Sequence, residues 1–366
     1  MLAAPTRSND WVFLHIPRTG GTSVAAWIRE VAQAIDGTSD VTSAIDAMAR
    51  RLAPELLFED IQTFDKFAQC HGSASRWHLP PDVYHRCMPD ASSRPHGVDP
   101  YEPGRRVFCT VRDPIDRFVS NFCRAHGLMQ LGSSRATRFL KSVAGPSMSG
   151  DRAAAWISAF VGKHFNYTSR TLGTAPTKAI ADFTLHAIPQ AWFVYAASSG
   201  TGGTKQQQLG EQQCHAVFRL SNLSAYWPMF VLENNVLGLA ESGTQVPDLP
   251  HVGSSKGGAR GPSKDVVEPC PISRRELSSE SILLLQKAYA EDYAMLRNDS
   301  LFWAPQHPQQ LRTKLKRQQT ALPRSQQTPK SSSHPHLQPP RADPSSTRWC
   351  RVYGEGCHLK VVGGRS

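Results

Sequence analysis

No part of this sequence stays apolar for long enough to cross a membrane. It contains no run of about 18 apolar residues, and its start lacks the short apolar stretch and small-residue cleavage site of a secretory signal. A spanning helix needs about 20 mostly apolar residues, and a signal peptide needs the second pattern. Taken by itself, the sequence therefore predicts a soluble chain.

The signature of an ordinary nucleoside triphosphatase is also missing. That signature is G-x-x-x-x-G-K-[ST], in which the lysine reaches the terminal phosphates. The nearest equivalent here has adjacent glycines, Gly20 and Gly21, and no lysine precedes Thr22. The sequence therefore argues against an ordinary P-loop NTPase.

A recognisable metal-ligand spacing is lacking as well. Histidines and cysteines gather at Cys70, His71, His78, His85 and Cys87. Zinc ligands usually occur as two pairs with a few residues inside each pair, and this cluster matches none of those patterns. We therefore predict no metal site.

One pattern that is present is a strand, loop and helix near the start. Residues 11–16 form an apolar, β-prone run that ends at Pro17 and the Gly20-Gly21 pair. Apolar residues then recur at helical spacing, at Val24, Trp27, Ile28, Val31, Ala32 and Ile35. Such a turn directs a helix N-terminus and loop N–H groups at one point, where Arg18 adds a permanent charge. The segment therefore predicts a phosphate or sulfate site.

A second segment repeats this plan about ninety residues later. Residues 107–111 form a short apolar strand, Asp113 is a good N-cap and Pro114 fits the first helical position. Arg112 then lies at the carboxyl end of the strand, where open α/β sheets bind ligands, and Ser120 lies about two turns along the helix. We expect Arg112 and Ser120 to hold a second phosphate.

Together the two segments resemble a known enzyme family. Residues 17–23 (Pro-Arg-Thr-Gly-Gly-Thr-Ser) look like the 5′-phosphosulfate loop of sulfotransferases that use 3′-phosphoadenosine 5′-phosphosulfate (PAPS), and residues 112–120 look like their 3′-phosphate motif. The likeness is greatest to the carbohydrate O-sulfotransferases related to heparan and chondroitin sulfotransferases. It implies an α/β fold, a single P-loop-like sulfotransferase domain over residues 1–303 with a central, mainly parallel sheet flanked by helices.

The resemblance also implies a role for each site residue. PAPS would be bound by Arg18, Thr19, Gly20, Gly21, Thr22, Ser23, Arg112 and Ser120. Arg18 would also stabilise the leaving group. It stands where the family usually has Lys, and it keeps the charge and the donors. His78 would be the base that deprotonates a glycan hydroxyl, with His71 as the second choice, because relatives place a catalytic His between the two motifs.

Weaker similarities follow in the family's order. They are Ile188-Pro189-Gln190, a strand-like run over residues 192–195, residues 218–224, residues 251–256 and a closing helix through Tyr289, Asp292 and Tyr293. Two Gly/Ser- or Gln-rich stretches, residues 131–151 and 198–213, look like surface insertions. His15 is expected to be structural, and Arg117 either contacts the nucleotide or pairs with the nearby Asp113 and Asp116.

The positive charge is concentrated at the end of the chain. The formal net charge is +11, and residues 304–366 hold 11 Lys and Arg against 2 Asp and Glu, which leaves 30 against 28 for residues 1–303. With eight Pro and eight Gln, this tail is expected to be a disordered basic extension. The tail accounts for most of the high pI, so we expect no nucleic-acid partner.

The cysteines and the N-glycosylation sequons indicate in which cellular compartment the protein could fold. Cys109 falls within a predicted strand and Cys123 on the following helix, so both are predicted to be core thiols, whereas Cys350 and Cys357 could close a loop in the tail. Sequons at Asn166, Asn222 and Asn298 suit a secretory lumen. The resemblance implies a Golgi glycoprotein. The family's Golgi members usually carry an N-terminal membrane anchor, so either that anchor is missing from this sequence or the enzyme is located elsewhere.

Two other classes of protein fit the same residues. A nucleotide-dependent kinase would use a similar phosphate cradle, but it would need a carboxylate for Mg²⁺ and no 3′-phosphate site. A catalytically idle nucleotide-binding protein would keep the fold and lack the base. Nucleotide preference separates the kinase from the sulfotransferase, and turnover with and without His78 separates the enzyme from the idle fold.

Overall fold

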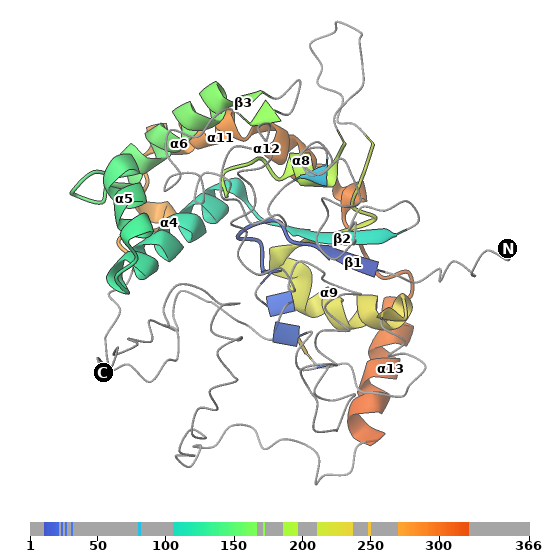
Figure 1. Cartoon of the computed structure of the whole chain (residues 1–366). Coiled ribbons are helices and arrows are strands. Elements are labelled where there is room, and N and C mark those ends of the chain that lie inside the picture. The colour runs from blue at the N-terminus through green and yellow to red at the C-terminus, as the bar shows by residue number, and fades with distance from the viewer. Residues whose placement is uncertain are drawn as a thin grey trace, which may run out of the picture.

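The computed structural model, shown in Figure 1, describes residues 11–21, 23, 24, 26, 27, 31, 80, 81, 105–166, 171, 172, 186–196, 211–236, 248, 249 and 270–321. Both predicted phosphate loops are included except for Thr22. The predicted base His78 and its alternative His71 lie outside the described residues, as do residues 251–256 and Cys350 and Cys357.

A parallel three-stranded sheet forms the centre of the described fold (Figure 1). Strands β1 (Trp11–Leu14), β2 (Arg106–Val111) and β5 (Ala216–Arg219) lie in the order β1-β2-β5. Leu14 is paired with Cys109, so β1 and β2 end at the same edge of the sheet. The predicted α/β class with a parallel central sheet is confirmed, although the sheet is small.

Both faces of this sheet are buried. On β2, Val107 and Cys109 belong to one hydrophobic cluster and Phe108 to the other. On β1, Leu14 joins the first cluster and Phe13 the second. Successive side chains of a strand point to opposite faces, so a strand covered on both sides needs an unbroken apolar run. That is why residues 11–16 and 107–111 are almost entirely apolar.

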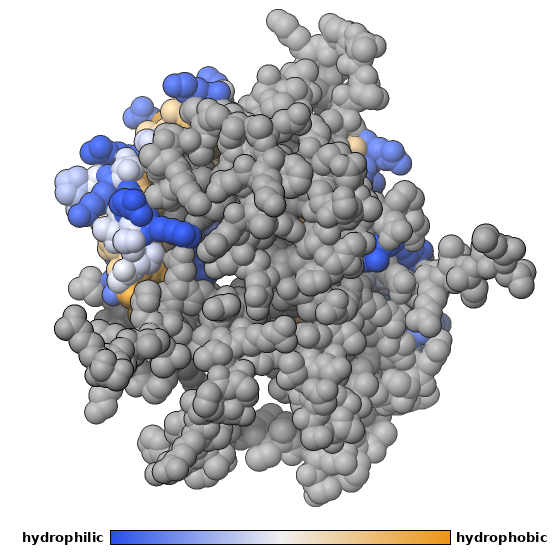
Figure 2. All heavy atoms as spheres, viewed as in Figure 1, coloured by the Kyte–Doolittle hydropathy of each residue, from blue (hydrophilic) through white to orange (hydrophobic). Residues whose placement is uncertain are grey.

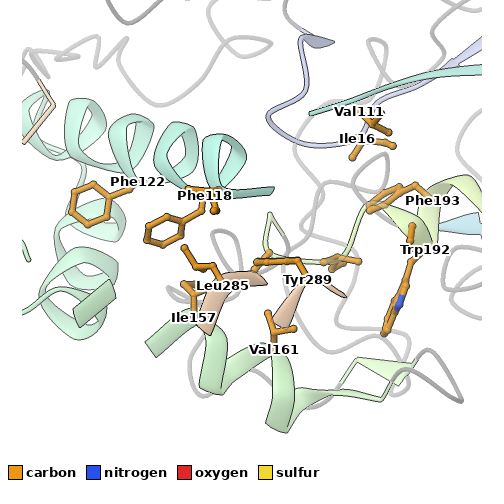
Figure 3. Packing of buried hydrophobic residues seen from close by; sticks show 14 of the residues in the cluster. Ile16, Val111, Phe118, Phe122, Ile157, Val161, Trp192, Phe193, Leu285 and Tyr289 are labelled. Carbon is orange, nitrogen blue, oxygen red and sulfur yellow. The ribbon is translucent and has the colours of Figure 1, made fainter. Parts of the chain in front are cut away.

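The larger group of helices covers the first face (Figure 1). These helices are α4 (Pro114–Gln130), α5 (Ser134–Val143), α6 (Gly150–His164), α8 (Ala191–Val194), α11 (Ser279–Ala288) and α12 (Ala290–Leu296). Figure 3 shows Phe118 and Phe122 of α4 in the same packed layer as Ile157 and Leu285. Short elements join them: β3 (Phe165–Asn166), β4 (Thr171–Leu172), η7 (Arg274–Glu276) and η8 (Asp299–Leu301).

The second face is covered by α9 (Leu220–Glu233), and α13 (Pro308–Ala321) packs beside it (Figure 1). Phe108, Trp227 and Phe230 form the aromatic centre of this cluster. Leu311 and Leu315 of α13 pack against the same cluster. The prediction of a disordered extension from residue 304 is therefore wrong for residues 308–321, because two leucines one turn apart give this polar segment an apolar contact.

Two other local predictions are also wrong. Residues 192–194 of the strand-like run belong to helix α8 instead, where the Ala191 N–H donates to Asp292 Oδ1 at 2.8 Å, and only Tyr195 is extended, in a β-bridge with Gln212. Residues 131–151 are not a surface insertion, because they contain α5. This helix buries an apolar stripe at helical spacing, formed by Ala136, Phe139, Leu140 and Val143.

Four cysteines form two disulfides, which corrects the prediction of free core thiols. Cys109 of β2 is bonded to Cys214, just before β5, and Cys123 of α4 is bonded to Cys270. The partners are 105 and 147 residues apart in sequence, so local patterns do not reveal these pairs. Each bridge connects elements that the sheet and helix packing bring together.

The surface over the α5 and α6 side of the molecule is mostly hydrophilic, with small hydrophobic areas between the polar side chains (Figure 2). In the part of the chain that the structure describes, no helix is both long enough and apolar enough to cross a membrane.

Candidate nucleotide-binding site

The first predicted loop makes a tight turn between β1 and the helical residues that follow. Arg18 has φ +68° and Gly20 has φ +106°. The Gly20 carbonyl accepts hydrogen bonds from Ser23 N at 2.9 Å and Val24 N at 3.3 Å, which starts the helix. Val24, Trp27 and Val31 are then buried, as their helical spacing predicts. The loop therefore has the strand-to-helix form expected of an anion site.

Both glycines are required by close packing. A Cβ at Gly20 would lie 2.6 Å from Leu220 Cδ1, and its positive φ disfavours other residues. A Cβ at Gly21 would overlap the imidazole of His15. His15 in turn stacks on Phe13, with ring centroids 5.8 Å apart. His15 thus packs between Phe13 and the Gly21 backbone, which agrees with the structural role expected for it.

The Thr19 hydroxyl forms its contacts inside the protein. Its Oγ1 donates to the Ile16 carbonyl at 2.7 Å and lies 2.9 Å from Thr110 Oγ1 on β2. The residue is fully buried. Its hydroxyl therefore fastens the loop to the neighbouring strand, and only its backbone remains to contribute to the predicted phosphosulfate site.

The two predicted phosphate loops meet through Arg18 and Ser120. Arg18 Nη2 donates to Ser120 Oγ at 2.9 Å and to the Ser120 carbonyl at 3.0 Å. These residues are 102 positions apart in sequence, and each was predicted from its own motif. Within the described residues, Arg18 Nε is buried without a hydrogen-bond partner. The parallel pairing of β1 with β2 brings Arg18 and Ser120 together.

Arg112 is held by its backbone. Gln190 Oε1 accepts from Arg112 N at 2.8 Å, and Gln190 Nε2 donates to the Arg112 carbonyl at 2.7 Å. Asp292 Oδ2 accepts a further bond from the same amide at 3.3 Å. Within the described residues, the Arg112 guanidinium itself forms no hydrogen bond. Gln190 therefore fixes the backbone of Arg112, and none of the described residues holds its guanidinium by a hydrogen bond.

Arg117 forms no ion pair with Asp113 or Asp116 among the described residues, so that expectation is wrong, while the expected nucleotide contact stays a prediction. Its Nε donates to the Pro17 carbonyl at 2.9 Å and its Nη1 donates to the Ile188 carbonyl at 2.7 Å. The side chain is 2% exposed. Arg117 therefore connects α4 to the first loop and to the segment before α8, and its partners are carbonyls, not Asp113 or Asp116.

Positive charge is concentrated at this edge of the sheet. Burial, together with the neighbouring Arg124, Arg112 and Arg117, lowers the pKa of Arg18 to about 9. Burial also lowers the pKa of Arg112, while Asp116 and Asp113 act in the opposite direction. Guanidiniums that repel one another in a partly desolvated place favour a bound anion, because its charge would offset theirs.

Burial lowers the pKa of two histidines near the site, His15 and His186. Burial, followed by Arg18 and Arg124, lowers the pKa of His15 to about 4. The same causes hold the pKa of His186 well below its usual range, and its Nδ1 lies 2.8 Å from Asn121 Oδ1. A lowered pKa favours the neutral form of both imidazoles.

A small cavity beside α4 is lined by Arg117, Asn121, His186 and Tyr289, among others. Its enclosed space is about 10 Å³, room for roughly one water molecule and far too small for a nucleotide. Neither Arg18 nor Arg112 lines it, so it is distinct from the predicted nucleotide site.

The structure thus brings Arg18, Thr19, Gly20, Gly21, Arg112 and Ser120 to one edge of the sheet, with Ser23 at the start of the first helix. Gln190 and Asp292 belong to segments that the resemblance had singled out without assigning them a role. Arg124 was not predicted, although it lies one helical turn after Ser120. Among the described residues, no group of three or more His, Cys, Asp or Glu side chains is placed to hold a metal ion.

Comparison of the chain with protein-family models, with curated proteins and with solved structures finds no match.

Proposed function

We propose that this protein is a PAPS-dependent sulfotransferase that acts on a hydroxyl of a glycan. The proposed enzyme has a single P-loop-like sulfotransferase domain with its donor site at the carboxyl edge of β1 and β2. The contact of Arg18 with Ser120 carries the proposal, because two motifs predicted separately to bind the two ends of one nucleotide lie side by side. The surrounding cluster of arginines supports it, because PAPS carries several negative charges.

In this scheme, Arg18 and the loop N–H groups of Thr19, Gly20, Gly21, Thr22 and Ser23 hold the 5′-phosphosulfate. Arg112 and Ser120 hold the 3′-phosphate. Arg18 Nε, buried without a partner among the described residues, is a donor that an anion would satisfy. The buried Thr19 hydroxyl keeps its hydrogen bonds to Ile16 and Thr110, so in this scheme Thr19 binds the 5′-phosphosulfate through its backbone N–H.

The proposed reaction forms a bond from the acceptor oxygen to sulfur and breaks the bond from sulfur to the bridging phosphate oxygen. His78, with His71 as the second candidate, takes the proton of the acceptor hydroxyl. Arg18 offsets the negative charge that develops on the departing phosphate. The proposed reaction needs no metal.

The proposed compartment is the Golgi, in its lumen or at its membrane. The two disulfides support an oxidising compartment, since such bonds are rare in the cytosol. We propose a glycan or polysaccharide as the acceptor and no nucleic-acid partner.

The direct test is stabilisation of the folded protein by adenosine 3′,5′-bisphosphate, compared with ADP and with the Arg112→Ala variant. A ligand that binds only the folded state raises the free energy of unfolding by about 2.7 kcal/mol at a hundred-fold excess over its Kd. We expect this gain with the bisphosphate, a smaller gain with ADP, and loss of the bisphosphate gain in Arg112→Ala. Thermal unfolding measures all three.

Equal or greater stabilisation by ADP would overturn the PAPS assignment and favour a kinase. No response to either nucleotide would favour a catalytically idle fold. If the bisphosphate alone stabilises the protein, a screen of glycan hydroxyl acceptors with PAPS follows, with His78→Gln and His71→Gln used to identify the base.

A further inference from the structure

Two carboxylates flank the end of β2, immediately beside the predicted 3′-phosphate site. Asp113 follows Arg112 directly, and Asp116 lies on the first turn of α4. Asp113 Oδ1 caps this helix, accepting from Ile115 N at 2.9 Å and from Asp116 N at 3.2 Å. Unopposed, these two negative charges would attract the Arg112 guanidinium and repel an incoming phosphate.

A distant arginine holds both carboxylates. Arg274 Nη1 lies 3.0 Å from Asp113 Oδ1 and 3.4 Å from Asp116 Oδ1. The two pairs cross 161 and 158 positions of sequence, so chain proximity does not explain them. Among the described residues, Arg274 is the only cation that forms an ion pair with Asp113 or Asp116. Arg112, although it is adjacent in sequence, forms no ion pair with either.

The segment that carries Arg274 is anchored on both sides. Cys270 is bonded to Cys123 of α4 four residues before Arg274, and the buried side chains of Ile272 and Leu277 belong to the first hydrophobic cluster. Ile272 and Leu277 also close over Gly150, where a Cβ would lie 2.9 Å and 3.1 Å from them. The half-exposed Arg274 side chain therefore extends from a backbone whose position next to the α4 N-terminus is set by a disulfide and by core packing.

We propose that Arg274 is a positioning residue that keeps Arg112 available to the 3′-phosphate by occupying the carboxylates of Asp113 and Asp116. This inference rests on the proposed function. With Arg274 present, the two arginines balance the two carboxylates, and Arg112 can turn to the ligand. Without it, the carboxylates exceed the cations by one, and Arg112 is drawn toward Asp116. Charges a few ångströms apart at a protein surface interact strongly enough to change anion affinity.

The experiment compares Arg274→Ala with Arg275→Ala, which removes an equal charge from the adjacent exposed position. Binding of adenosine 3′,5′-bisphosphate and of adenosine 5′-monophosphate, which lacks the 3′-phosphate, is measured by calorimetry at low salt. We expect Arg274→Ala to weaken bisphosphate binding by about three- to tenfold, to leave monophosphate binding within about twofold, and to exceed the effect of Arg275→Ala. Arg274→Lys should retain most of the affinity.

A double-mutant cycle separates positioning from simple loss of charge. If Arg274 only adds positive charge, the effects of Arg274→Ala and Asp116→Asn on bisphosphate affinity will add. If Arg274 occupies Asp116, then Asp116→Asn will restore most of the lost affinity in the Arg274→Ala background and change the wild type little. Additive effects, or equal losses in the Arg274→Ala and Arg275→Ala variants, would overturn the inference while the proposed function stands. Failure of the wild type to bind the bisphosphate would overturn the proposed function first.

Discussion

In the first loop, two glycines fit where a side chain would clash, and one threonine uses its hydroxyl to hold the loop against neighbouring backbone and side-chain atoms. Gly20 has a left-handed φ and lies against Leu220, and Gly21 lies against His15. The Thr19 hydroxyl is hydrogen-bonded to the Ile16 carbonyl and to the Thr110 hydroxyl. Their contribution to the proposed site is to keep the loop backbone in place, while the charge comes from the arginines.

Gly21→Ala should destabilise the protein. The new methyl group would overlap the His15 imidazole, and overpacking of this kind costs about 1–3 kcal/mol. The matched control is Gly127→Ala within α4, where a Cβ meets no atom within 4 Å and the change should stabilise the helix by about 0.5–1 kcal/mol. Urea unfolding measures both values. A Gly21→Ala variant as stable as the wild type would contradict the packing of His15 under this loop.

At the scale of elements, the position of the second loop depends on helices from far along the chain. Gln190, next to α8, pairs with both polar groups of the Arg112 peptide at the end of β2. Asp292 of α12 binds both the Gln190 amide and the Ala191 N–H. Three elements are thus fixed around the backbone of one residue at the end of β2.

Gln190→Met keeps the length of the side chain but removes its hydrogen bonds to the Arg112 peptide. A partly buried N–H and carbonyl left unpaired should lower the free energy of unfolding by about 1–3 kcal/mol. Because Arg112 is then less well fixed, binding of adenosine 3′,5′-bisphosphate should also weaken in the folded variant. Gln309→Met, on the exposed side of α13, serves as the control and should stay within about 0.5 kcal/mol of the wild type. Unchanged stability and affinity in Gln190→Met would show that Arg112 does not depend on this contact.

On the scale of the whole molecule, two hydrophobic clusters cover the two faces of the sheet, and the disulfides join parts that are distant in sequence. Cys109 and Cys214 are fully buried, whereas Cys123 and Cys270 are half-buried near the segment that carries Arg274. The first bridge lies inside the core beside the sheet. The second holds the η7 segment to the outside of α4.

Mild reduction of the folded protein should therefore open Cys123–Cys270 before Cys109–Cys214, because thiol–disulfide exchange requires access to a sulfur atom. Alkylation followed by peptide mass spectrometry identifies which cysteines are freed. The Cys123→Ala, Cys270→Ala double variant should lose about 2–4 kcal/mol of stability, since the bridge closes a long loop. Reduction of both bridges at the same rate, or of the buried bridge first, would contradict the burial in this structure.

The sequence alone determined the two strand-loop-helix segments, because their signals are local. Apolar runs, the Gly20-Gly21 pair, the Asp113 cap and Pro114 act within a few residues, so β1, β2 and α4 were predictable. Alternation could not distinguish strand from helix in the short aromatic run at residues 192–195, and the apolar stripe of residues 131–151 was hidden among Gly and Ser. Two leucines were too weak a signal to predict α13 in a polar tail.

The tertiary structure alone decided which residues became partners. The bonds from Arg18 to Ser120, from Gln190 to Arg112, and from Arg274 to Asp113 join positions that local patterns cannot relate. The same holds for Cys109 with Cys214 and for Cys123 with Cys270. The physical reason is that these contacts form only after a parallel sheet with buried faces has aligned its strand ends, and burial then determines which side chains pair and which stay available to a ligand.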